Sequence, residues 1–170
     1  MKIRKAVLKD VKSIAKVHVD SWKTTYKHIV PDEYLNKLSY KSREQLWEEI
    51  VPSGNVYVAE NNQGQIVGFA NGGRERSRQY DGYEGELYAI YLLQEYQGCG
   101  IGKQLIMPII EHLKQLKIHS MVVFVLEDNS ACQFYEALGG KKMDSLEIVI
   151  AGKKLNEVVY GWSDISYILS

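Results

Sequence analysis

Apolar positions in the first third of the chain recur at two different periods. Residues 2–7, KIRKAV, alternate polar and apolar residues closely enough to predict a short β-strand. From Val11 to Tyr26, apolar residues recur every three or four positions, which predicts an amphipathic helix. Residues 31–38 and 40–51 predict two further short helices, and Pro31 suits the first turn of the earlier one.

The middle of the chain alternates β-rich runs with a helical pattern. Residues 55–61 and 65–72 flank the turn sequence NNQG and predict a hairpin, whereas the polar residues 73–82 predict a mobile loop. The longest strand pattern, residues 83–93, leads into a helix from about Gly100 to Leu116. Residues 120–127 form a continuous apolar run, which is typical of a strand buried on both faces. This alternation predicts an α/β fold whose central sheet is partly parallel.

The last part of the chain predicts one short helix and a hairpin. Residues 128–140 offer Asn129 as a helix N-cap and two glycines as the stop. Residues 141–165 contain two predicted strands joined near Ala151 and Gly152. No repeat or low-complexity segment interrupts the chain. A length of 170 residues fits one domain, so we expect a single domain over residues 1–170.

Composition narrows the classes of partner. The chain carries 21 Lys and Arg against 21 Asp and Glu, so no net positive field favours nucleic acid or anionic lipid. The sequence shows neither a signal-peptide pattern nor an apolar run long enough to span a membrane, and we expect a cytoplasmic protein. Two cysteines, Cys99 and Cys132, are too few for a disulfide scaffold, and the four histidines lack metal-ligand spacing, so we expect free thiols and no metal.

Three glycines at alternate positions, Gly98, Gly100 and Gly102, stand between the longest strand and its helix. Glycine permits positive φ and close approach of a ligand, and a helix N-terminus attracts anions such as phosphate. The spacing differs from a nucleoside-triphosphate P-loop, because Gln104 follows Lys103 where Ser or Thr is required. It also differs from the dinucleotide fingerprint, because Lys103 stands three positions after Gly100 where a glycine is required.

The pattern Gln97-x-x-Gly100-x-Gly102 resembles the acetyl-coenzyme A signature of the GCN5-related N-acetyltransferases (GNAT family). Residues 128–142 are similar to the family's second cofactor segment, residues 1–26 to its first strand and helix, and residues 152–162 to its closing strand. The resemblance covers nearly the whole chain. It implies a GNAT-type mixed central β-sheet flanked by α-helices, with acetyl-coenzyme A as the cofactor.

The resemblance also implies which residues hold the cofactor. The backbone N–H groups from Gln97 to Gly102 would converge on the pyrophosphate, and the strand before them would pair its backbone with the pantetheine arm. Asn129 would contact that arm or serve only as a helix cap. The implied cofactor-binding residues are Ile90, Tyr91, Leu92, Gln97, Gly98, Cys99, Gly100, Ile101, Gly102, Lys103 and Asn129. Family members often carry Lys or Arg where this chain has Cys99, so one charge contact to phosphate is missing here.

Two residues are candidates for proton transfer. Tyr135 stands where family members frequently place a tyrosine, whose hydroxyl can protonate the departing coenzyme A thiolate; the alternative is an aromatic that only packs its helix on the sheet. Glu86 is our candidate for the base that takes the proton of the amine, directly or through a water, and the alternative is a solvated strand glutamate. Tyr88 is the reserve for that role.

Trp22, Tyr26 and Tyr34, with Tyr88, are candidates for the wall of the substrate pocket, because the first helices flank the acceptor side in this family. At helical spacing, Trp22 and Tyr26 can equally be core residues.

The resemblance therefore predicts an N-acetyltransferase that transfers acetyl from acetyl-coenzyme A to a primary amine by direct attack in a ternary complex. A small-molecule amine is the favoured acceptor. A protein N-terminus or lysine is the alternative acceptor, and a non-catalytic acyl-coenzyme A-binding regulator is the alternative class. A homodimer is possible.

Overall fold

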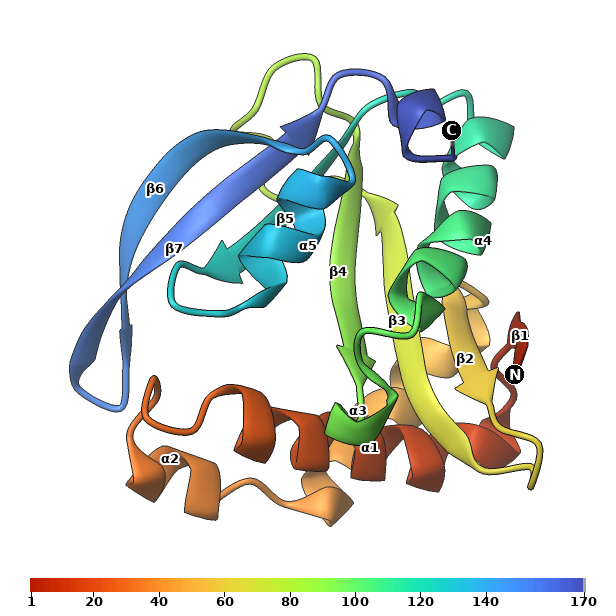
Figure 1. The fold of residues 1–170 in the computed structure, drawn as a ribbon, viewed down its shortest axis with the longest axis vertical. Helices are drawn as coiled ribbons and strands as arrows, with labels where there is room; N and C mark the ends of the chain where they lie inside the picture. The colour runs from red at the N-terminus through yellow and green to blue at the C-terminus, as the bar shows by residue number, and fades with distance from the viewer. Residues whose placement is uncertain (170) are drawn as a thin grey trace.

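The computed structural model describes residues 1–169 and is built on a seven-stranded sheet in the order β1-β2-β3-β4-β5-β7-β6 (Figure 1). The strands are β1 (Lys2–Lys5), β2 (Val56–Glu60), β3 (Ile66–Arg74), β4 (Gly85–Leu92), β5 (Met121–Leu126), β6 (Lys141–Ile150) and β7 (Lys153–Trp162). The β4–β5 pair is parallel and the other neighbouring pairs are antiparallel. The predicted mixed sheet is confirmed.

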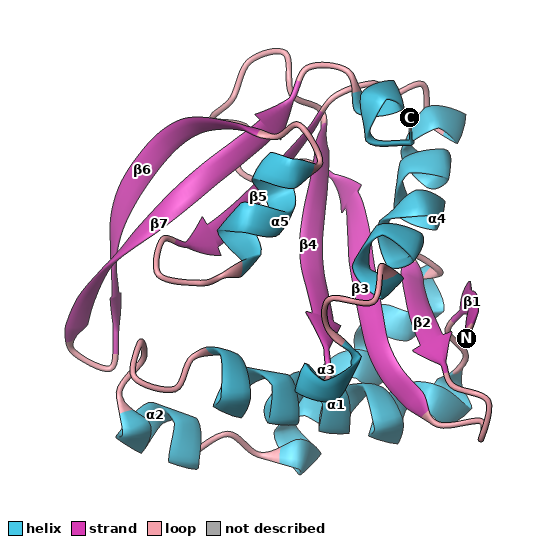
Figure 2. Ribbon diagram, viewed as in Figure 1, coloured by secondary structure: helices cyan, strands magenta, loops and turns pink. Residues whose placement is uncertain are grey.

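Helices cover both faces of this sheet (Figure 2). They are α1 (Val11–Thr25), α2 (Asp32–Asn36), α3 (Tyr40–Ile50), α4 (Ile101–Gln115) and α5 (Ala131–Ala137). Successive strand residues point to opposite faces, so Phe69 packs with α1 and α3 while Ala70 packs with α4. The core therefore has two apolar layers, one on each face of the sheet.

Most of the elements predicted from the sequence form where expected. The terminal hairpin turns at Ala151 and Gly152, which both adopt positive φ (47° and 81°), the conformation that a two-residue hairpin loop requires. The predicted loop over residues 73–82 is wrong at its start, because Gly73 and Arg74 extend β3 and pair with β4. The predicted cap of α5 is also displaced by one residue, since Ser130 occupies the N-cap position.

The feature that places the site is the divergence of β4 from β5. The two strands pair only at Gly85 with Met121 and at Glu86 with Val122, and beyond these residues they separate (Figure 1). On its other edge β4 stays paired with β3, with an irregularity that leaves Tyr88 opposite no residue. From Leu87 onwards, the edge of β4 that faces β5 therefore has no strand partner.

Candidate active site

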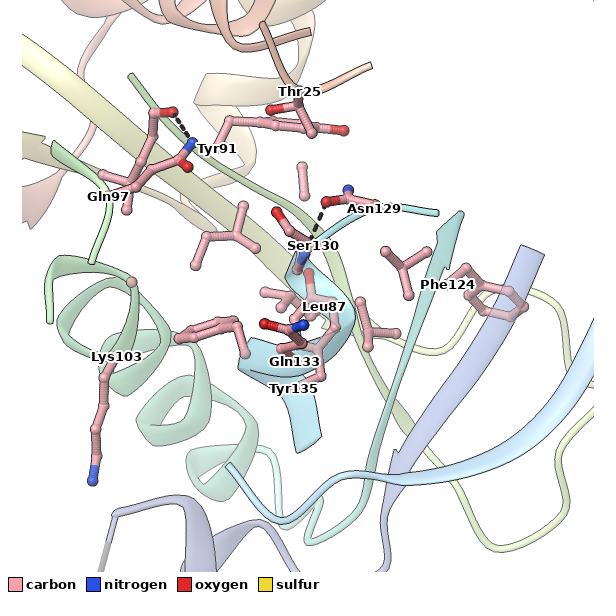
Figure 3. Close-up of a pocket in the computed structure, with 18 of the residues that line it drawn as sticks. Thr25, Leu87, Tyr91, Gln97, Lys103, Phe124, Asn129, Ser130, Gln133 and Tyr135 are labelled. Carbon is pink, nitrogen blue, oxygen red and sulfur yellow. Dashed lines mark hydrogen bonds between the residues drawn. The ribbon is translucent and has the colours of Figure 1, made fainter. Parts of the chain in front are cut away.

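A cavity of about 530 Å³ occupies the gap between the diverging strands (Figure 3). That volume is typical of small-molecule sites. The lining comes from α1, β4, the glycine-rich turn, β5 and α5. Twelve of the residues predicted for the site line it: Tyr26, Tyr88, Ile90, Tyr91, Leu92, Gln97, Gly98, Gly100, Gly102, Lys103, Asn129 and Tyr135.

The glycine-rich turn presents bare backbone to this cavity. Gly98 and Gly100 adopt positive φ (72° and 76°), and a Cβ built on either would meet no atom within 4 Å. Their amides and that of Cys99 find no backbone or side-chain acceptor among residues 1–169, and α4 begins directly after them at Ile101. Several N–H groups beside a helix N-terminus form a site for an anionic group such as phosphate.

Gln97 holds the turn rather than contributing its backbone to it. Its side-chain amide donates to the carbonyl oxygen of Leu92 at 3.1 Å, and its own N–H donates to Gln94 at 3.2 Å. The expectation that N–H groups converge on the phosphate from Gln97 onwards is therefore wrong at its first residue. The Leu92 oxygen also accepts from the Ser21 hydroxyl at 3.2 Å, so that oxygen is already bonded within the protein.

The other residues of the turn have different surroundings. Gly102 lies against α5, because a Cβ there would be 3.0 Å from the Phe134 ring, which would have to shift by a few tenths of an ångström. Ile101 is buried in the core, so only its backbone can reach a ligand. Cys99 is exposed and donates weakly to Gln97, and the Lys103 side chain extends away from the other labelled residues (Figure 3).

Tyr135 lies at the bottom of the cavity and is 4% exposed. Burial, followed by the nearby Tyr91 and Cys132, raises the pKa of its phenol above the ordinary value, so the hydroxyl keeps its proton at neutral pH. Its ring also packs against Tyr160 and Trp162, with centroids 6.1 and 6.2 Å away. A proton-donor role and a packing role are both compatible with this position.

Asn129 connects two walls of the cavity. Its side-chain oxygen accepts from the N–H of Ala131 at 2.9 Å, and its amide donates to the Tyr26 hydroxyl at 3.1 Å. The first bond stabilises the beginning of α5, because the Asn129 side chain accepts from the first residue of the helix, although Ser130 occupies the N-cap position. The second joins residues 103 positions apart and holds Tyr26 at the edge of the cavity.

Glu86 is buried and bonded to one arginine. Its carboxylate accepts from the Nη2 and Nε of Arg76 at 2.6 and 3.2 Å and from the Arg76 backbone N–H at 3.0 Å. The Arg76 guanidinium also lies 3.9 Å from the centre of the Tyr88 ring, and the Tyr88 hydroxyl donates to the Arg74 carbonyl oxygen. The cavity lining includes the next residue, Leu87, and does not include Glu86, so the base role of Glu86 stays a prediction.

Trp22 and Tyr34 belong to an apolar cluster behind Tyr26 rather than to the lining. The Trp22 ring is 4.3 Å from that of Tyr26 and 6.0 Å from that of Tyr34. Ile148 and Ile150, near the tip of the β6–β7 hairpin, pack on the same cluster. Of the four predicted wall residues, Tyr26 and Tyr88 line the cavity, and Trp22 and Tyr34 do not.

Comparisons with known proteins decide the family. A sequence model described as the acetyltransferase (GNAT) family matches residues 22–140. A relative from Bacillus subtilis (strain 168), the uncharacterized N-acetyltransferase YuaI, is 47% identical over 164 residues, which is 96% of this chain and 94% of that protein. The chain belongs to the GNAT acetyltransferase family.

Two further matches extend the comparison. The spermidine N(1)-acetyltransferase of Thermoplasma acidophilum is 28% identical over 85% of this chain and 91% of its own. The crystal structure of the PaiA N-acetyltransferase from the same organism, in complex with coenzyme A, has a TM-score of 0.73 at 22% identity, covering 92% of this chain and 96% of that one. The predicted fold and the predicted class, an acetyl-coenzyme A-dependent N-acetyltransferase, are confirmed.

Several features of this GNAT site could not be found from the sequence. Phe124, Thr25 and Gln133 line the cavity, and Arg76 binds Glu86. Nothing in the local pattern around them indicates a site. No helix within residues 1–169 is long and apolar enough to cross a membrane.

Proposed function

We propose that the protein transfers acetyl from acetyl-coenzyme A to the primary amine of a small molecule by direct attack in a ternary complex. One observation supports this most strongly: the strand divergence opens a single cavity that reaches from the glycine-rich turn to Tyr135. A ligand with an anionic end and a thioester end fits such a cavity, because the turn offers N–H groups and Tyr135 offers a hydroxyl.

The strand β4 would bind the extended arm of the cofactor. The backbone from Leu87 to Tyr91 has no strand partner on the β5 side, so its N–H and C=O groups are available to amides of the pantetheine arm. In this proposal the predicted residues Ile90 and Tyr91 contribute main chain, and the bonded oxygen of Leu92 does not contribute.

The proposed reaction has one bond-forming step, one bond-breaking step and two proton transfers. The neutral amine attacks the carbonyl carbon of the thioester, the C–S bond breaks, and the sulfur takes a proton from Tyr135. Glu86 accepts the proton of the amine, directly or through a water, and its contacts with Arg76 orient the carboxylate for that role.

The acceptor side supports a small amine over a peptide. The hairpin tip packs on the α1–α2 region through Ile148 and Ile150, and Lys153 donates to the Ile29 carbonyl oxygen at 2.7 Å. In this proposal, the contacts would limit the room for an extended peptide on the acceptor side. The named acceptor of one relative, spermidine, is also a small amine.

A screen of acceptors tests the proposal. Purified protein with acetyl-coenzyme A should release free thiol in the presence of small primary amines, such as polyamines and amino acids, and not with peptides that present an N-terminus or a lysine. Release with peptides alone would contradict the small-amine assignment. Cofactor binding without thiol release by any amine would favour the regulator alternative.

A further inference from the structure

Three aromatic side chains with hydrogen-bond donors meet beside the reaction centre. Trp22 and Tyr26 lie one turn apart on α1, and their ring centroids are 4.3 Å apart. Tyr91 comes from β4 and is stacked on His18 with the rings 5.3 Å apart and nearly parallel, at 19°. Ring packing therefore fixes where the three donors point.

The donors of Trp22 and Tyr26 face the oxygen of Tyr91, and both lower the pKa of its phenol. The Tyr26 oxygen accepts from Asn129, which leaves its own proton to donate. Among residues 1–169, the Nε1 of Trp22 is buried and makes no hydrogen bond of normal geometry. A buried donor left unpaired costs ~1–3 kcal/mol, so such a group marks a place where a bound acceptor would be favourable.

The two phenols border the cavity beside Tyr135. Tyr26, Tyr91 and Tyr135 all line it, so a bound molecule can contact all three. Burial raises the pKa of Tyr26, and the neighbouring Tyr91 and Tyr135 raise it further. Burial also raises the pKa of Tyr91, against an opposite effect of Trp22 and Tyr26. The phenols are therefore close enough to influence one another, and both stay protonated donors at neutral pH.

We infer that the hydroxyl groups of Tyr26 and Tyr91 bind the carbonyl oxygen of the acetyl group, with the Trp22 N–H directed at the same phenols. This inference rests on the proposed function, in which Tyr135 lies at the thioester sulfur. The carbonyl oxygen is two bonds from that sulfur, so donors beside Tyr135 are placed to reach it. The oxygen can only accept hydrogen bonds, which matches a group of hydroxyl and N–H donors.

The role in the reaction follows from charge. When the amine attacks, the C=O electron pair moves onto the oxygen, and the two hydroxyls stabilise that negative charge without giving up their protons. When the pair returns, the C–S bond breaks and the sulfur takes the proton of Tyr135. Asn129 is the positioning residue. Its amide donates to the Tyr26 oxygen, so the Tyr26 proton points away from Asn129 and can be donated to the ligand.

The test compares two ligands that differ only in the acetyl group. Calorimetry gives the dissociation constants of acetyl-coenzyme A and coenzyme A for the wild type, Tyr26→Phe and Tyr91→Phe. Each variant should lose about tenfold in its preference for acetyl-coenzyme A, the size of one hydrogen bond, while its affinity for coenzyme A stays unchanged. Tyr34→Phe is the matched control, since it removes a hydroxyl from the same aromatic cluster but not from the cavity lining.

Turnover gives the second measurement. Because the charge on the oxygen develops during reaction, kcat should fall more than binding does, by about 10²-fold in either variant. An unchanged ligand preference would overturn the inference, and so would an equal loss of both ligands together with a lower melting temperature. If the wild type acetylates no amine, the proposed function fails, yet the ligand preference still decides the inference.

Discussion

The two ends of the cavity are built in different ways. At the glycine-rich turn, the binding groups are backbone N–H groups of consecutive residues, and the local sequence alone sets their conformation. At the other end, the reaction end, the lining groups are side chains from three parts of the chain: Tyr26 directly after α1, Tyr91 from β4 and Tyr135 from α5. A short motif therefore reveals the first end, whereas the second exists only once the chain is folded.

The two ends also differ in burial. The residues Gln97 to Gly100 are exposed, and no atom lies in front of Gly98 or Gly100. The reaction end is buried, and its polar groups depend on particular partners such as Arg76 and Asn129. Substitutions at the turn should therefore change the affinity for the cofactor and leave the rest of the fold intact. Substitutions at the reaction end should change the rate of the chemical step or the stability of the fold.

The largest effect is expected for Glu86→Gln at the reaction end. Glutamine keeps the size of the side chain and can still accept from Arg76, but it is not a base, so the chemical step should slow by about 10²–10⁴-fold. Rates measured from pH 6 to 9 with saturating acceptor would show this loss. Glu84→Gln, an exposed neighbour, is the control. An unaltered rate and pH profile in Glu86→Gln would assign the proton to Tyr88 or to water.

The next effect is expected at the turn, for Gly100→Val. A β-branched residue is strained at the φ of 76°, and its side chain would occupy the open space in front of the amides. Coenzyme A should bind about 100-fold more weakly, equivalent to ~2.7 kcal/mol, as calorimetry would measure.

Gly64→Val separates backbone strain from loss of the binding site. Gly64 has a φ of 78° and open space around it, but it lies in the β2–β3 turn away from the cavity. This variant should lose a similar amount of stability and keep its affinity for coenzyme A. Equal weakening of binding in both variants would contradict the role of the turn.

The features that could be predicted from the sequence are those set by local residues, and the features that could not are contacts between distant residues. The helices and hairpins could be predicted because period and turn residues are local signals, and the turn at Gly98 and Gly100 could be predicted because its conformation needs glycine. The Asn129–Tyr26 bond joins residues 103 positions apart, so no local signal exists for it. The Arg76–Glu86 pair lies within a short distance in sequence but forms only because residues 75–84 fold back on β4.

A smaller effect is expected from His18, which stacks on Tyr91 and whose protonation links the free energy of unfolding to pH. Burial lowers the pKa of His18 to about 4, and its Nδ1 accepts a hydrogen bond from Trp47. As pH falls below ~6.5, the unfolded chain takes up a proton that the folded chain does not, so acid favours unfolding. Between pH 7 and 5 this residue should reduce the free energy of unfolding by about 2 kcal/mol.

Denaturant titrations of the wild type and His18→Gln at the two pH values would measure that difference. The variant should lose less stability on acidification, because it has no imidazole to protonate. Identical pH dependence in both proteins would contradict this role of His18.

Tyr135→Phe tests the central claim, that this cavity catalyses transfer and does not merely bind the cofactor. The change removes one hydroxyl and keeps the ring that packs on Tyr160 and Trp162. We predict that the single-turnover rate falls at least about tenfold, ~1.4 kcal/mol, while acetyl-coenzyme A affinity stays within a few-fold. A single-turnover rate equal to that of the wild type would contradict the account.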